Sequence, residues 1–111
     1  MLMEKKIWVA ITAHKPLERT DCLINLLRNY TEYPFEFNVN IYIDYDSQND
    51  VENLELILQE FEKLNIQIKV ADPGYEGWYL TWAHKTDLAL AILNHKADYY
   101  IYTENDMLMT Y

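Results

Sequence analysis

Ile7-Trp8-Val9-Ala10-Ile11 is a continuous run of apolar, strand-forming residues near the start of the sequence. A run without polar alternation is typical of a strand that is covered on both faces, as strands of parallel sheets are. The run is much shorter than the roughly 18 apolar residues that a membrane span requires, and it stops at His14-Lys15-Pro16. We therefore interpret it as a central parallel strand and not as a signal peptide.

Strand and helix patterns alternate along the rest of the chain. Leu23, Leu26, Leu27 and Tyr30 have the spacing of an amphipathic helix. The full set of expected elements after the first strand is a helix beginning near Thr20 and Asp21, a strand over 39–43, a helix over 51–64, a strand over 66–70, a helix over about 79–95 and a strand over 99–102. This order predicts a three-layer α/β/α fold with a mainly parallel sheet. We expect residues 1–111 to form a single domain.

The helix expected over about 79–95 has two distinguishable faces. Trp82, Leu90 and Leu93 lie on one face, which we expect to be buried. His84, Asp87 and Ala91 lie on a face that is rotated away from it. We therefore expect the first face to pack on the sheet.

The charge of the chain limits its partners. Eighteen Asp and Glu against nine Lys and Arg give a net charge of −9. Such a field repels nucleic-acid backbones and anionic membranes, so we expect no nucleic acid as a partner. We also expect no membrane span, because no stretch is long and apolar enough. A phosphorylated ligand would need a local counter-charge from a metal or from a few placed cations.

Cysteine usage points to a compartment. Cys22 is the only cysteine, so no internal disulfide can form. A reducing compartment is the simpler interpretation, and we expect the protein to be cytoplasmic.

Polar side chains follow all four expected strands. They are Thr12-Ala13-His14, Asp44, Asp72 and Glu104-Asn105-Asp106. The carboxyl ends of parallel strands meet at one edge of the sheet, where open α/β sheets bind ligands. For any single residue the alternative is the ordinary preference of loops for Asp and Asn. The four sets together favour a functional edge.

Glu104 and Asp106 are two positions apart, so in an extended segment they point to the same side. Two carboxylates are hard oxygen ligands that leave positions open on Mg²⁺ or Mn²⁺ for the phosphates of a substrate. The alternative is a solvated turn or the cap of a following helix. The segment is thus a candidate metal-diphosphate site.

The order of elements, ending in the acidic triplet Glu104-Asn105-Asp106, resembles the nucleotide-binding half of the GT-A glycosyltransferases. Their Asp-x-Asp motif binds a divalent metal and a nucleotide sugar. In single-domain inverting members an Ala-Arg-Asn segment before the motif faces the diphosphate, and Ala83-His84-Lys85 looks similar to it. Here this segment lies about one helical turn further from the triplet, and His84 replaces the arginine. The resemblance implies a Rossmann-like GT-A sheet.

The resemblance also implies roles for individual residues. Asp106 would be the main metal ligand, with Glu104 and Asn105 beside it, and Glu104 would also face the ribose or sugar. His84 or Lys85 would approach the diphosphate; the alternatives are an ordinary helical histidine and a surface lysine whose stem lies over Trp82 or Leu88. The nucleoside would be contacted by Thr12, Ala13, His14, Asp44 and Asp72.

The expected function is metal-assisted transfer of a sugar from a UDP- or GDP-linked donor to an unknown acceptor, with Mn²⁺ or Mg²⁺ as cofactor. In GT-A enzymes the acceptor site and the catalytic base follow the acidic motif, so we expect this chain to be the N-terminal part of a larger GT-A catalytic domain. The alternative is a non-catalytic α/β nucleotide- or partner-binding module. Self-association into a homo-oligomer is compatible with either. A nucleotidyltransferase is disfavoured, because residues 12–19 contain no glycine.

Overall fold

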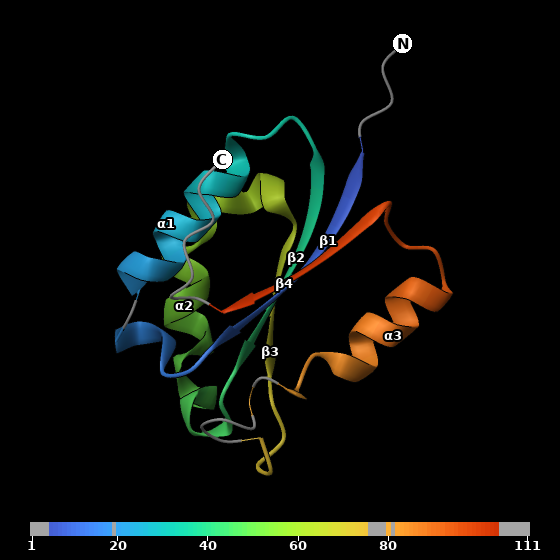
Figure 1. Cartoon of the computed structure of the whole chain (residues 1–111). Helices are drawn as coiled ribbons and strands as arrows, with labels where there is room; N and C mark the ends of the chain where they lie inside the picture. Colours follow the sequence, from blue (N-terminus) through green and yellow to red (C-terminus); the bar gives the residue numbers. More distant parts are fainter. Residues whose placement is uncertain (1–4, 19, 76–79, 81, 105–111) are drawn as a thin grey trace.

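The computed structural model describes residues 5–18, 20–75, 80 and 82–104. Within these ranges the strands β1 (Lys6–Ala13), β2 (Glu36–Ile43), β3 (Ile66–Val70) and β4 (Tyr99–Glu104) form one sheet in the order β3-β2-β1-β4. All three neighbouring pairs are parallel (Figure 1). The predicted α/β class and parallel sheet are confirmed, and β1 is a central strand as its apolar run predicts.

One face of the sheet is covered by α1 (Thr20–Thr31) and α2 (Val51–Ile57). Residues Leu23, Leu26, Leu27 and Tyr30 of α1 are all buried, as their spacing predicts. They pack against the strand residues that alternate toward this face, such as Val9 of β1. This is the larger of the two apolar cores, because both helices contribute to it.

The connections contain short 3-10 segments. These are η1 (Pro16–Glu18) after β1, η2 (Tyr45–Asp50) after β2 and η3 (Gln59–Leu64) before β3. The helix expected over 51–64 is therefore interrupted: α2 ends at Ile57, and η3 continues after Leu58, whose φ and ψ are −92° and 4°. Leu54, Leu58, Phe61 and Leu64 nevertheless remain buried.

The opposite face of the sheet carries α3 (Lys85–Leu93) (Figure 1). Ala91 of α3 packs on Trp8, Ala10 and Tyr42, with Leu88 at the edge of this cluster. The sheet thus has helices on both faces, an arrangement compatible with three α/β/α layers. Among the described helices, none is long and apolar enough to cross a membrane.

The expectation for the third helix is wrong in two respects. The helix begins at Lys85 and not near residue 79. The face expected to be buried is instead exposed: Trp82, Leu90 and Leu93 are 54%, 52% and 74% exposed. His84 and Ala91, on the other face, are buried. The physical reason lies in the strand residues below α3, which offer polar and aromatic partners to the face that carries His84 and Asp87.

Candidate functional site at the carboxyl edge of the sheet

The strand order places a topological switch point between β1 and β4. The chain adds β2 and then β3 on one side of β1, and it returns to the other side of β1 for β4. Ligands of open α/β sheets bind outside the carboxyl ends of the strands at such a point. Here these ends carry Thr12 and Glu104, which are register partners. The structure thus brings together two residues that the sequence places in one site.

Thr12 faces the α3 side of the sheet. It is buried, and its Oγ1 lies 3.1 Å from the hydroxyl oxygen of Tyr102. The ring of Tyr102 stacks on His84, with centroids 4.1 Å apart and planes at 11°. Burial and the nearby charge of Glu104 raise the pKa of Tyr102 above its usual value, although the hydrogen bond with Thr12 works against them. Tyr102 therefore stays protonated and keeps Thr12 in place.

Asp44, directly after β2, is buried and has two differently engaged oxygens. Its Oδ1 accepts hydrogen bonds from the backbone N–H of Lys15 at 2.8 Å and from the Ser47 hydroxyl at 2.9 Å. Lys15 adopts a φ of 47°, which turns its N–H toward Asp44 at some cost in backbone strain. Oδ2 is buried and has no hydrogen-bond partner among the described residues. Buried carboxylate oxygens normally accept a hydrogen bond, so Oδ2 is a candidate acceptor for a hydrogen-bond donor of a ligand.

A hollow of about 200 Å³ lies beside Asp44. Its lining also includes Lys15, Ser47, Asp46 and Asp50. His14 lies close by, with Nδ1 3.8 Å from Asp44 Oδ1, and its side chain is 51% exposed. Ala13, by contrast, is fully buried in the core on the α1 side. Of these two predicted nucleoside contacts, His14 offers a side chain and Ala13 only its backbone.

Asp72 lies apart from the switch point. It follows β3 at the edge of the sheet, so β2 and β1 separate it from β4. It is exposed and lines a separate hollow of about 180 Å³ with Tyr75 and Lys69. Asp72 and Glu104 therefore belong to opposite ends of the same edge.

The candidate metal ligands are only partly within the structure. Glu104 is half-buried at the end of β4, whereas Asn105 and Asp106 lie outside the described residues. Among the described residues, no group of three or more His, Cys, Asp or Glu side chains could hold a metal ion. Of the two predicted metal ligands, Glu104 and Asp106, only Glu104 thus lies among the described residues.

The two predicted phosphate-binding residues have different surroundings. His84 is buried at the N-terminal end of α3, between Tyr102 and the edge of the Tyr42 ring. Lys85 is exposed, and its Nζ lies 3.5 Å from the centre of the Trp82 ring. This cation–π contact matches the alternative in which the lysine stem covers Trp82.

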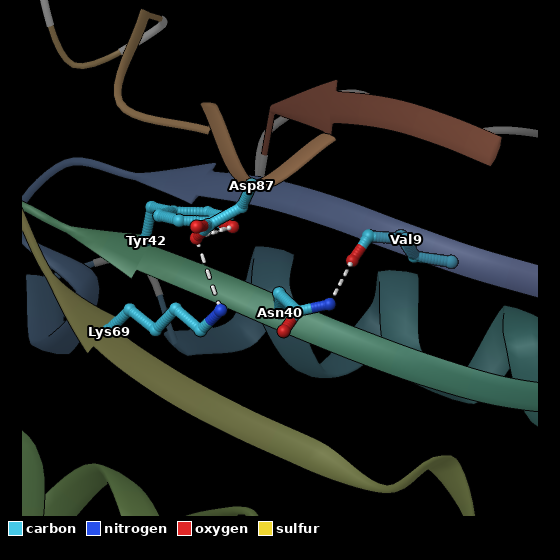
Figure 2. Close-up of polar contacts among 5 residues, drawn as sticks. All are labelled: Val9, Asn40, Tyr42, Lys69 and Asp87. Carbon is cyan, nitrogen blue, oxygen red and sulfur yellow. Dashed lines mark hydrogen bonds and ion pairs between the residues drawn. The ribbon is translucent and has the colours of Figure 1, made fainter. Parts of the chain in front are cut away.

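Sequence reasoning missed a polar cluster made by Tyr42, Lys69 and Asp87. The Tyr42 hydroxyl donates to Asp87 Oδ2 at 2.7 Å, and Lys69 Nζ lies 3.1 Å from the same oxygen (Figure 2). Burial alone would raise the pKa of Asp87, but the hydrogen bonds from Tyr42 and Lys69 outweigh it and the pKa is lowered. Strand alternation puts Tyr42 and Lys69 on the α3 side, which is the one signal that was available.

Comparisons with known proteins returned no match to this chain among protein-family models, curated proteins or solved structures. The function must therefore be argued from the geometry of the site.

Proposed function

We propose that this chain is the donor-binding half of a metal-dependent GT-A glycosyltransferase, with a Rossmann-like sheet that binds a nucleotide sugar. The observation that supports this proposal is the meeting of β1 and β4 at the switch point, where Thr12 and Glu104 are register partners. Asp44 directly follows the neighbouring strand β2. A nucleotide at this edge would lie across three strand ends, as ligands of open α/β sheets do.

Asp44 would recognise the base. Its Oδ1 is held by Lys15 and Ser47, so Oδ2 is the oxygen left to accept an N–H. Uracil and guanine present such an N–H on the ring, whereas N3 of cytosine carries a lone pair. Oδ2 is buried, so the base must displace a neighbour to reach it. His14 is exposed and can move aside.

The diphosphate would need a counter-charge. Lys85 is engaged over Trp82, and His84 is stacked on Tyr102, so neither extends freely toward the switch point. Asp106 with Glu104 would hold Mn²⁺ or Mg²⁺, and Asn105 would lie beside it. Such an ion, when bound, acts as a Lewis acid on the diphosphate leaving group. Binding of the nucleotide should therefore depend strongly on the metal.

The reaction would transfer the sugar to an acceptor bound by another part of a larger GT-A catalytic domain. The catalytic base would also come from there. The residues at the ends of β1, β2 and β4 would then bind and orient the nucleotide-sugar donor. The second candidate is a non-catalytic α/β nucleotide- or partner-binding module, which is favoured by the engagement of His84 and Lys85 within the structure.

Calorimetric titration of the chain with UDP and GDP, with and without Mn²⁺, tests the proposal. We expect binding only with the metal, and we expect Asp106→Ala to abolish it. Asp98→Ala is the matched control, because Asp98 lies at the other end of the sheet, where it accepts a hydrogen bond from the Lys6 N–H. Metal-independent binding would favour the non-catalytic module. No binding to a chain shown to be folded would contradict both candidates for nucleotide binding.

A further inference from the structure

A third hollow lies on the α3 side of the sheet, toward the amino ends of the strands. Its volume is about 390 Å³, within the range of roughly 300 to 1,000 Å³ that is usual for small-molecule sites. Five side-chain amides line it, and we call it the amide cleft: Asn38, Asn40, Asn65, Gln67 and Asn94. Asn38 lies in the first half of β2 and Asn65 directly precedes β3, so the cleft extends toward the amino ends of these strands.

The amide cleft exists because α3 covers only part of this face. The apolar cluster under α3 draws Trp8 and Ala10 from β1 and Tyr100 from β4. Toward β2 and β3, the strand positions that face the same side are polar, and Asn40 and Gln67 are register partners there. A sheet surface that carried apolar residues here would leave them in water. The amides therefore form a floor that is compatible with solvent and available to a ligand.

Three of the amides are held in a fixed orientation. Asn40 Nδ2 donates to the carbonyl oxygen of Val9 at 3.3 Å, Asn65 Nδ2 to that of Phe37 at 2.9 Å, and Asn94 Nδ2 to that of Leu90 at 2.8 Å. Because each partner is a carbonyl, the nitrogen must face it and the oxygen must turn away. Figure 2 shows this for Asn40, whose nitrogen points to Val9. No described residue donates to these three oxygens, so they are acceptors ready for a ligand.

The charges that line the amide cleft are largely compensated. Asp87 is paired with Lys69 at 3.1 Å and also accepts the Tyr42 hydroxyl, so it is not available to a cationic ligand. Lys96, at the wall of the cleft, is exposed to water. The oriented amide oxygens accept hydrogen bonds, and the adjacent Lys69–Asp87 ion pair is already satisfied. Such a site suits a ligand that carries several hydroxyl donors and no net charge.

We infer that the amide cleft binds a neutral polyhydroxylated ligand, such as a saccharide unit. This site is separate from the carboxyl-edge site, and the inference does not depend on the function proposed above. Each neutral hydrogen bond contributes modestly in water, so binding of a single unit is weak and rests on several amides at once.

Saturation-transfer NMR on the full chain tests this inference, with methyl glucoside and inositol as neutral probes. We expect saturation transfer to at least one probe, and we expect it to persist when UDP and diamagnetic Mg²⁺ are added, because the carboxyl-edge site is elsewhere. Gln67→Ala should weaken binding about fivefold, the loss expected for one neutral hydrogen bond. Gln48→Ala is the matched control, since Gln48 is also exposed but lies in η2.

Four outcomes would overturn the inference. They are no transfer to either neutral probe, equal effects of the two glutamine variants, loss of the signal on adding UDP and Mg²⁺, and stronger binding of glucuronate or inorganic phosphate than of methyl glucoside. The first two would remove the site, the third would assign the sugar to the carboxyl edge, and the fourth would show that Lys96 makes the cleft an anion site. Thermal unfolding of each variant verifies that it is folded.

Discussion

The hydroxyl of Tyr42 donates a 2.7 Å hydrogen bond to the carboxylate of Asp87, and it thereby ties the central part of the sheet to α3. Lys69 of β3 completes the contact from the edge of the sheet. Together with the apolar contacts of Ala91, this polar tie orients α3 on its face of the sheet. It also holds the pKa of Asp87 below 3.8, because the hydrogen bonds outweigh the effect of burial.

Tyr42→Phe should lower the free energy of unfolding at pH 7 by about 1 kcal/mol. This is below the usual range for a hydrogen bond to a charged group, because the Asp87 side chain is 37% exposed. Since folding lowers the pKa of Asp87, the stabilisation is present above the ordinary pKa and is lost as the pH falls through the folded one. Urea unfolding at pH 7 and in strong acid measures the difference.

In acid the wild-type protein and the Tyr42→Phe variant should converge in stability. Tyr45→Phe is the control, because Tyr45 is an exposed tyrosine of η2. An equal loss at both pH values would mean that the tyrosine acts through packing and not through the carboxylate.

Tyr30→Phe should leave stability unchanged or raise it by up to about 1 kcal/mol. Tyr30 is 2% exposed, and its hydroxyl has no hydrogen-bond partner among the described residues. Removing an unpaired buried polar atom removes its desolvation cost. Chemical denaturation at neutral pH checks this, with the exposed Tyr99→Phe as control. A loss above about 1 kcal/mol would show that the hydroxyl has a partner.

The same variant should change the alkaline limb of the stability profile. Burial, and then the neighbouring Tyr33, raise the pKa of Tyr30 to about 12, above the ordinary value of 10.0. The fold therefore disfavours the ionised phenol, and stability is lost as the pH rises from 10 toward 12. Tyr30→Phe should lose less stability over that interval than the wild-type protein. Parallel slopes for the two proteins would contradict the assignment.

Asp44→Asn should change which nucleotide binds at the carboxyl edge. The asparagine oxygen can still accept from Lys15 and Ser47, so its nitrogen would occupy the place of Oδ2. That nitrogen donates a hydrogen bond, which suits N3 of cytosine and opposes the N–H of uracil. We expect affinity for UDP to fall about tenfold or more relative to CDP, the consequence of roughly 1.4 kcal/mol.

Titration of both nucleotides against the wild-type protein and the Asp44→Asn variant, each with Mn²⁺, measures this change. Asp72→Asn is the control, because Asp72 is exposed beyond the edge strand β3. An unchanged ratio of UDP to CDP affinity would exclude Asp44 from base recognition.

Leu93→Gln should alter the free energy of unfolding by no more than about 0.5 kcal/mol, as is usual for surface positions. Leu93 is 74% exposed, although it belongs to the apolar stripe of α3. Ala91→Gln, two positions earlier, should cost several times more, because Ala91 is buried on Trp8 and Ala10. Denaturation of both variants compares the two faces. If the Leu93 variant is the less stable one, α3 packs through the opposite face.

The two helices show how far sequence patterns predict this fold. In α1 the apolar positions predicted the buried face because the sheet surface opposite them is apolar as well. In α3 the apolar stripe gave the wrong face, because Tyr42 and Lys69 favour Asp87 at the interface. A helical period identifies the faces of a helix, but the surface that it meets decides which face is buried.

The candidate site was predictable to the extent that it depends on strand direction. Parallel strands bring Thr12, Asp44 and Glu104 to one edge, and this follows from the order of the elements. One of the two hydrogen bonds that hold Asp44 comes from Lys15, 29 residues earlier. The tie between Tyr42 and Asp87 spans 45 residues. Such contacts between residues far apart in the sequence depend on how the layers pack. A local sequence pattern therefore does not predict them.

The pairing of β1 with β4 has a consequence for the order in which the protein folds. The Lys6 N–H donates to the Asp98 carboxylate across 92 positions of the chain, whereas β2 follows β1 after one helix. Closing so long a loop costs more entropy than joining neighbouring elements, and such contacts tend to form late. During synthesis, we expect one edge of β1 to stay unpaired until β4 emerges, so the carboxyl edge that carries Thr12 and Glu104 forms only when β4 pairs.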